Sequence, residues 1–202
     1  MIVCLEGING SGKTTLGNGL LAIWAGGSAC TIDPTQHTPF GRALRTAIMA
    51  ETSLGADVET LAFASARLRT AEVLTSPAPE ARDLVVLERW AGAVMAYGTV
   101  AGASPVLLEA VEQRLLSALP IDITVLLDLP GGDAEARVNQ LAERNRFETQ
   151  GSGYLERIRR QYLAWASNRQ VSVVDGRQEV ATIVELVAEL MKAKAPHISA
   201  DP

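Results

Sequence analysis

The sequence predicts an α/β fold in which one parallel sheet of five strands has helices on both of its faces. Short β-rich runs alternate with helical patterns along the whole chain, as in such folds. Clusters of proline and glycine separate these units. The 202 residues, 48% of them hydrophobic and 20% charged, are enough for one well-cored domain and too few for two large ones.

The five candidate strands are too short and too rich in β-branched residues to be surface helices. They span residues 2–6, 28–33, 84–88, 123–128 and 171–175. Eight further stretches have apolar residues at helical spacing. These span residues 16–25, 41–50, 58–75, 90–100, 104–118, 133–143, 154–168 and 179–192. We therefore predict a single domain over residues 1–192 and, because the periodicity ends there, a flexible tail over residues 193–202.

Composition argues against several classes of partner. A net charge of −5 gives no basic footprint for nucleic acid or for an anionic membrane surface. No apolar run approaches the roughly 20 residues of a membrane span, and the chain starts with a strand instead of a signal sequence. We therefore expect a cytoplasmic protein. Cys4 and Cys30 lie in apolar runs without ligand spacing and are expected to be buried thiols, while His37 and His197 are isolated.

A phosphate-binding loop follows the first predicted strand. Residues 7–14, Gly-Ile-Asn-Gly-Ser-Gly-Lys-Thr, fit the pattern G-x-x-x-x-G-K-[ST] at every fixed position, and a helical pattern follows. Glycines let backbone N–H groups turn inward around a phosphate chain, Lys13 would reach the β- and γ-phosphates, and Thr14 would ligate Mg²⁺. The alternative is a glycine-rich turn that binds nothing. The predicted ATP-binding residues are Gly7, Asn9, Gly10, Ser11, Gly12, Lys13, Thr14 and Thr15.

Acidic residues end the predicted strands, at the edge where parallel α/β sheets bind their ligands. These residues are Glu6, Asp33, Glu88, Asp128 and Asp175. Arg89 follows Glu88, so the acid could hold Mg²⁺ through water while the arginine binds a phosphate. An ion pair that caps the strand end explains the same spacing equally well.

Two further groups of residues suggest nucleotide binding. Phe63 and Arg67 are four residues apart on one predicted helix face, so a ring and a guanidinium group could clamp a flat base. The alternative for Phe63 is ordinary core. Six arginines could close over polyphosphate with Gly151 and Gly153 as hinges, or they could form a solvated helix face paired with glutamates. The arginines are Arg137, Arg144, Arg146, Arg157, Arg159 and Arg160, and the glutamates are Glu143, Glu148 and Glu156.

Residues 2–16 resemble the opening of the thymidylate kinases, which pass the γ-phosphoryl group of ATP to dTMP in nucleotide biosynthesis. Four further stretches resemble that family in the same order, so that nearly the whole chain is covered. They are residues 33–35 with 40–45, residues 61–67, residues 88–90 with Tyr97, and residues 127–130 with Arg137 and 144–148. The resemblance implies the three-layer α/β/α fold of P-loop NTPases and an arginine-rich lid over about residues 137–153. It also implies ATP and Mg²⁺ as cofactors, small-molecule nucleotides as partners and a homodimer.

The same resemblance implies roles for individual residues. Phe63 would stack on thymine, Arg67 would hydrogen-bond the base, and Tyr97 would pack against the deoxyribose. The implied acceptor-binding residues are Asn9, Asp33, Arg45, Phe63, Arg67, Arg89 and Tyr97, and the implied metal ligands are Thr14 and Glu88. The implied catalytic residues are Lys13, Arg89, Arg146 and Arg144. Some members carry a catalytic arginine in the loop, whereas others have glycine there and supply the arginine from the lid. This chain has Gly10 at that position and a basic lid, so it resembles the second kind, with Arg146 as the first choice and Arg144 as the second.

Several positions depart from the family pattern. Asn9, Glu88 and Asn145 stand where the family usually has aspartate, and Trp90 stands where it has tyrosine. Ala93 and Val94 replace a Ser, Thr or Asn that reaches the base. Because lost polar contacts shift specificity strongly, three functions stay open. They are phosphoryl transfer to dTMP, transfer to another or modified nucleoside monophosphate, and a nucleotide-dependent switch or non-catalytic ATP-binding module.

Overall fold

The five strands form one parallel sheet in the order β2-β3-β1-β4-β5. The computed structural model describes residues 1–51, 53–76, 83–140, 147 and 149–194. The strands are β1 (Ile2–Glu6), β2 (Ala29–Ile32), β3 (Leu84–Glu88), β4 (Ile123–Asp128) and β5 (Ser172–Asp175). The predicted α/β class, strand number and parallel pairing are therefore confirmed, with strand ends that differ by at most one residue.

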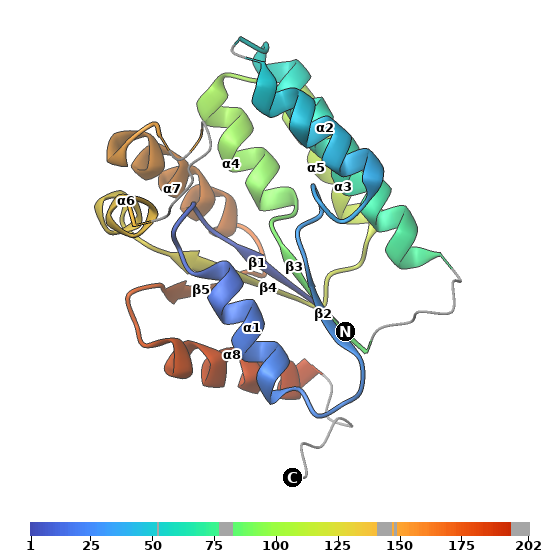
Figure 1. The fold of residues 1–202 in the computed structure, drawn as a ribbon, viewed down its shortest axis with the longest axis vertical. Helices are drawn as coiled ribbons and strands as arrows, with labels where there is room; N and C mark the ends of the chain where they lie inside the picture. Colours follow the sequence, from blue (N-terminus) through green and yellow to red (C-terminus); the bar gives the residue numbers. More distant parts are fainter. Residues whose placement is uncertain (52, 77–82, 141–146, 148, 195–202) are drawn as a thin grey trace.

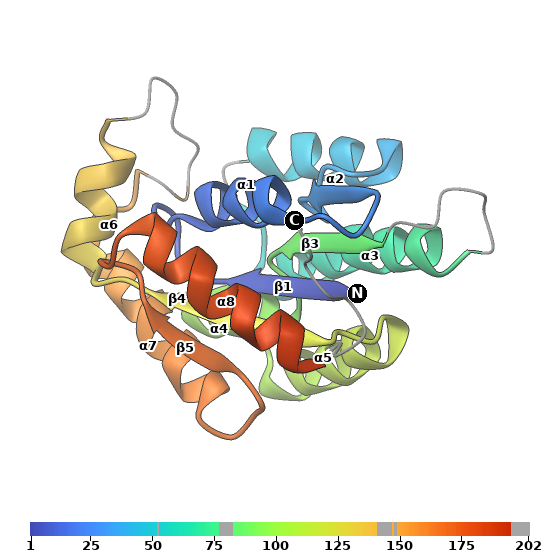
Figure 2. The ribbon, with the colours of Figure 1, turned by 90° about the horizontal axis from the view of Figure 1, so that it is seen from below.

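Helices cover both faces of the sheet, giving three layers (Figures 1 and 2). The described helices are α1 (Lys13–Ile23), α2 (Pro39–Ala50), α3 (Ala56–Thr75), α4 (Ala91–Ala101), α5 (Pro105–Ala118), α6 (Gly131–Val138), α7 (Ser152–Ala166) and α8 (Val180–Lys194). Helices α1 and α8 pack together on one face, whereas α3, α4, α5 and α7 cover the other and α2 packs on α3. No helix of the described part is long and apolar enough to cross a bilayer.

The central strand β1 divides the core between the two faces. Val3 and Leu5 belong to the apolar cluster under α1 and α8, whereas Cys4 belongs to the cluster under α4 and α7. All three are at most 1% exposed, as expected for a parallel strand that is buried on both faces. Burying a side chain such as Leu5 contributes about 1.5–3 kcal/mol, so β1 and the loop after it are held in a fixed position.

Helix ends differ from the predicted ranges for local reasons. Helix α1 begins at Lys13, three residues early, because Gly12 at φ 95° leads directly into the helix. Helix α2 begins at Pro39, where Thr38 Oγ1 accepts from Gly41 N at 3.0 Å; an N-cap threonine followed by proline is a start signal that the apolar spacing does not carry.

Three predictions at the C-terminal side need correction. Helix α6 ends at Val138 and is followed by a turn, and residues 141–143 of the predicted helix lie outside the described residues. Gly153 lies in the first turn of α7, which begins at Ser152, and not in the loop before that helix. Helix α8 continues to Lys194, so the predicted tail begins within a helix, and residues 195–202 lie outside the described part.

Candidate active site

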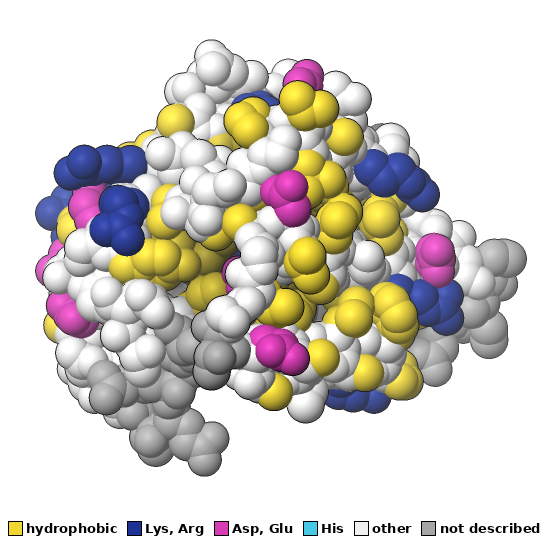
Figure 3. Space-filling model, turned by 90° about the horizontal axis from the view of Figure 1, so that it is seen from above, with side chains coloured by type: hydrophobic (Ala, Val, Ile, Leu, Met, Phe, Trp, Pro, Cys, Tyr) yellow, Lys and Arg dark blue, Asp and Glu magenta, His cyan; other side chains and the backbone are white. Residues whose placement is uncertain are grey.

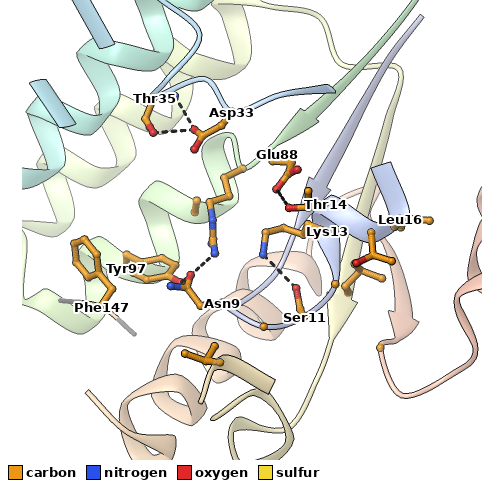
Figure 4. Close-up of a pocket in the computed structure, with 18 of the residues that line it drawn as sticks. Asn9, Ser11, Lys13, Thr14, Leu16, Asp33, Thr35, Glu88, Tyr97 and Phe147 are labelled. Carbon is orange, nitrogen blue, oxygen red and sulfur yellow. Dashed lines mark hydrogen bonds between the residues drawn. The ribbon is translucent and has the colours of Figure 1, made fainter. Parts of the chain in front are cut away.

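The predicted nucleotide-binding residues surround one cavity of about 620 Å³ at the carboxyl ends of the strands (Figure 4). Its lining includes the loop residues from Asn9 to Thr15 together with Asp33, Arg45, Phe63, Arg67, Glu88, Arg89 and Tyr97. Gly7 lies just behind this lining, and its carbonyl oxygen accepts hydrogen bonds from Lys13 and Arg89. The predicted catalytic residues Arg144 and Arg146 lie outside the described residues.

The loop glycines have conformations that other residues rarely adopt. Gly10 has φ +80°, and a Cβ atom there would lie 2.7 Å from the carbonyl oxygen of Ala134. Gly7 has φ +141°, and its Cβ would lie 2.7 Å from the carbonyl oxygen of Leu127. Both glycines therefore permit left-handed backbone and a close approach to the elements behind the loop.

Lys13 is 6% exposed and is held inside the loop at the first position of α1. Its Nζ donates to Gly7 O at 3.1 Å, Ile8 O at 2.8 Å and Ser11 Oγ at 3.2 Å. Burial, reinforced by the Arg89 guanidinium group, lowers the pKa of Lys13 well below its usual value. A bound anion would offset both effects, and the N-terminus of a helix favours an anion at the same place.

Thr14 and Glu88 lie together beside the loop. Thr14 Oγ1 donates to Glu88 Oε2 at 3.0 Å. The hydroxyl and the carboxylate both offer oxygen, the kind of ligand that Mg²⁺ prefers. Among the described residues, no group of three or more His, Cys, Asp or Glu is placed to hold a metal ion. The pair therefore fits an ion that takes its remaining ligands from phosphates and water.

Arg89 connects the loop to the helices beside the cavity. Its guanidinium group donates to Gly7 O at 2.8 Å, to Tyr162 Oη at 3.2 Å and to Asn9 Oδ1. Glu88 contacts Thr14 instead, so the two side chains point to different partners and the strand-capping ion pair is not the arrangement seen. Arg89 is the one non-glycine residue of the described chain with positive φ, at 74°. Left-handed backbone costs such a residue about 1–2 kcal/mol.

Asn9 joins the loop to α4. Its Oδ1 accepts from Tyr97 Oη at 3.0 Å as well as from Arg89. The family usually has a carboxylate at this position, whereas this chain places a neutral amide oxygen between two donors. Asn9, Arg89 and Tyr97, each predicted to bind the acceptor, thus form one hydrogen-bonded group.

Aromatic rings form the end of the cavity opposite the glycine-rich loop. Phe63 is half-buried and lines the cavity, so its ring is accessible instead of belonging to the core. Arg67 is 4% exposed, with its Nη1 donating to Phe63 O at 3.0 Å and its Cζ lying 5.9 Å from the Phe63 ring centre. The ring of Phe147 lies 6.0 Å from those of Phe63 and Tyr97. Sequence analysis assigned Phe147 no role, although an aromatic side chain after the lid arginines was a signal.

Asp33 and Arg45 meet through Thr35. Asp33 Oδ1 accepts from Thr35 N and Thr35 Oγ1, both at 2.8 Å, and Arg45 Nη1 donates to Thr35 Oγ1 at 3.2 Å. Burial alone would raise the pKa of Asp33, but hydrogen bonds from Gln36 and Thr35 outweigh it and lower the pKa. Asp33 therefore stays ionised and fixes the segment that presents Arg45 to the cavity.

The arginines after residue 136 have different surroundings. Arg159 makes two bonds to Asp128, at 2.6 and 2.8 Å, and a third to Glu156, and Arg160 lies 3.6 Å from Glu156. For these two arginines the ion-pair interpretation is correct. Arg137 instead lines the cavity and donates to Gly176 O at 3.0 Å, so for this arginine the predicted position over a polyphosphate stays possible.

The chain is similar in sequence to proteins of one known family. The family model described as thymidylate kinase matches residues 5–187. A thymidylate kinase of Neisseria meningitidis serogroup C is 32% identical over 197 residues, which cover 93% of this chain and 95% of the relative. Thymidylate kinases of Bordetella petrii, at 33% identity with 93% of each chain covered, and of Nitratidesulfovibrio vulgaris, at 29% with 98% and 95% covered, are similar as well.

Proposed function

This chain belongs to the thymidylate kinase family, and we propose that it transfers the γ-phosphoryl group of ATP to the 5′-phosphate of dTMP, giving ADP and dTDP. One observation carries the proposal: the phosphate-binding loop and the predicted acceptor-binding residues line a single cavity. Donor and acceptor phosphates bound there would meet between Lys13 and Arg89.

The reaction requires positioning and neutralisation of charge. An oxygen of the acceptor phosphate attacks the γ-phosphorus in line, and the bond from that phosphorus to the ADP oxygen breaks, without a covalent enzyme intermediate. Lys13 would hold the β- and γ-phosphates, and Arg89 would hold the acceptor phosphate against them. We propose that Arg146, and secondarily Arg144, adds charge stabilisation at the transferred group, as the resemblance implies.

Thr14 and Glu88 would hold Mg²⁺ on the donor phosphates. When bound, the ion supplies neutralising charge to the phosphate oxygens. The Thr14 hydroxyl would offer an oxygen lone pair to the ion, which its hydrogen bond to Glu88 Oε2 leaves available, while Glu88 would act directly or through water. Glu88 is one methylene longer than the aspartate that the family usually has here.

The base would lie between the aromatic rings and α4. Phe63 would stack on it, and Tyr97 would pack against the deoxyribose. Ala93 and Val94, at 3% and 5% exposed, line this part of the cavity and give the base edge an apolar wall instead of a hydrogen-bonding group. This observation favours, as a second candidate function, phosphorylation of another or modified pyrimidine nucleotide.

A panel of acceptors separates these functions. ADP release and diphosphate products would be measured with MgATP and dTMP, dUMP, dCMP, dGMP, dAMP or UMP, or with no acceptor. We expect dTDP to form fastest. A different preferred acceptor would support the second function, and ATP binding without any diphosphate product would indicate a switch or non-catalytic module.

We further propose that the protein is a homodimer and works in the cytoplasm. Hydrophobic side chains gather on the face shown in Figure 3, on the side of α2 and α3. Exposed hydrophobic side chains on these two helices include Phe40, Val58, Leu61 and Val73. Such a patch is typical of an interface, and light scattering of Leu61→Glu and wild type would test it. The thiols of Cys4 and Cys30 are free, which suits a reducing compartment.

A further inference from the structure

We propose that Glu6 is a positioning residue for the acceptor phosphate, because its carboxylate holds the turn that carries Arg89. Glu6 is the last residue of β1 and is 0% exposed, so it lies behind the cavity and would not touch a nucleotide. The inference rests on the proposed function, in which Arg89 binds the acceptor phosphate.

The backbone is tied to β1 on both sides of Arg89. Arg89 N donates to Leu5 O at 2.9 Å, and the next backbone N–H, of Trp90, donates to Glu6 Oε1 at 2.8 Å. Because φ at Arg89 is 74°, a conformation that a non-glycine residue does not favour, these two bonds hold the turn in place. The backbone conformation at Arg89 then directs its guanidinium group to Gly7 and Asn9.

The carboxylate also lies at the start of α4. Trp90 is the N-cap residue of that helix, where backbone N–H groups have no acceptor inside the helix and a negative charge is favourable. A Cβ atom at Gly92 would lie 3.0 Å from Glu6 Cδ and 2.7 Å from Trp165 Cζ3. Gly92 therefore lets the first turn of α4 approach the carboxylate closely.

The charge of Glu6 is incompletely satisfied. Its Oε2 and the Nε of Arg67 are both buried without a hydrogen-bond partner among the described residues. Burial raises the pKa of Glu6, while the Trp90 N–H and the guanidinium groups of Arg67 and Arg89 oppose that rise. A buried carboxylate with an unpaired oxygen destabilises a fold. We attribute its presence here to its bond to Trp90 N, which holds the turn that carries Arg89.

Glu6→Leu and Glu6→Gln test this role in the full-length protein, with steady-state kinetics for dTMP and ATP. Leucine removes the acceptor of the Trp90 bond, whereas the glutamine amide oxygen can keep it. The matched control is Glu112→Gln, because Glu112 is also buried, at 6% exposed, but pairs with Trp165 and Arg169 away from the cavity.

We expect Glu6→Leu to lower kcat/KM for dTMP about ten- to a hundredfold, with KM for dTMP raised and KM for ATP changed less than about twofold. Glu6→Gln should recover part of the loss, and Glu112→Gln should leave KM for dTMP unchanged. A folded Glu6→Leu variant with normal dTMP kinetics, or with an equal rise in both KM values, would overturn the inference.

If circular dichroism shows that Glu6→Leu is unfolded, Gly92→Ala takes its place, because it keeps the carboxylate and pushes α4 away from it. The same selective rise in KM for dTMP is then expected, and its absence would overturn the inference. An active wild type with unaffected variants would refute only the role of Glu6. A wild type that forms no dTDP would refute the proposed function and this inference with it.

Discussion

Replacing Lys13 by methionine should remove turnover while preserving the fold. Lys13 Nζ has three oxygen acceptors within 3.2 Å, so the amine is fixed where a phosphate chain would lie. At about 4 Å and an effective dielectric constant of about 20, one pair of unit charges is worth about 4 kcal/mol. Since each 1.4 kcal/mol or so is tenfold in rate, kcat should fall about a thousandfold.

Stability should respond differently, because burial lowers the pKa of Lys13 in the folded state. Because the folded-state pKa lies below the unfolded value of about 10.4, the charged amine opposes folding most strongly at low pH. This cost shrinks as pH rises above the folded-state pKa and is gone above the unfolded value. Methionine keeps the apolar stem and removes this cost, and Gly7 O keeps its bond from Arg89. The melting temperature at neutral pH should therefore stay close to that of wild type.

The assay is ADP release with MgATP and dTMP, beside thermal melting of each variant. Lys192→Met is the matched control, because Lys192 is exposed on α8 and pairs only with Glu189 among the contacts described for it. A Lys13→Met variant with kcat within about tenfold of wild type would show that this lysine does not neutralise the transferred phosphate.

Three other substitutions test the surroundings of the cavity. Gly10→Ala should lower the free energy of unfolding by at least about 1–2 kcal/mol, since its Cβ would meet Ala134 O at 2.7 Å; an unchanged urea midpoint would contradict this. Asp33→Asn should be less stable than wild type at neutral pH, and the difference should shrink as pH falls below about 4, because the folded-state pKa of Asp33 is lowered. A difference that stays constant from pH 3 to 7 would exclude this linkage. Phe147→Ala should raise KM for the acceptor about two- to tenfold, the value of an aromatic contact, and leave KM for ATP unchanged.

Most of the fold follows from patterns that are local in the sequence. Apolar β-branched runs and helical spacing gave the right order of strands and helices, because each element buries its own apolar face. Starts of helices were less accurate where another signal decides them, as at Thr38 and Pro39. The glycine pattern of residues 7–14 located the loop correctly, because left-handed backbone there depends on the glycines themselves.

Contacts between distant segments could not be obtained in this way. The pairing of Leu5 with Glu88 across β1 and β3 brings the Arg89 turn against the loop, although the residues are more than 80 positions apart. Positive φ at Arg89 has no sequence signal, because no glycine marks it. The buried position of Glu6 behind the cavity likewise depends on which strands are neighbours.

The sequence by itself therefore determined the class of fold, the position of the glycine-rich loop and the family, because these depend on spacing over a few residues and on side-chain chemistry. Only the tertiary structure decided that Asn9 links Arg89 to Tyr97, that Phe147 contacts Phe63, and that Arg159 pairs with Asp128 instead of facing the cavity. The physical reason is that sheet order and close packing set these distances. Both are decided by the free energy of the whole chain and not by that of any one segment.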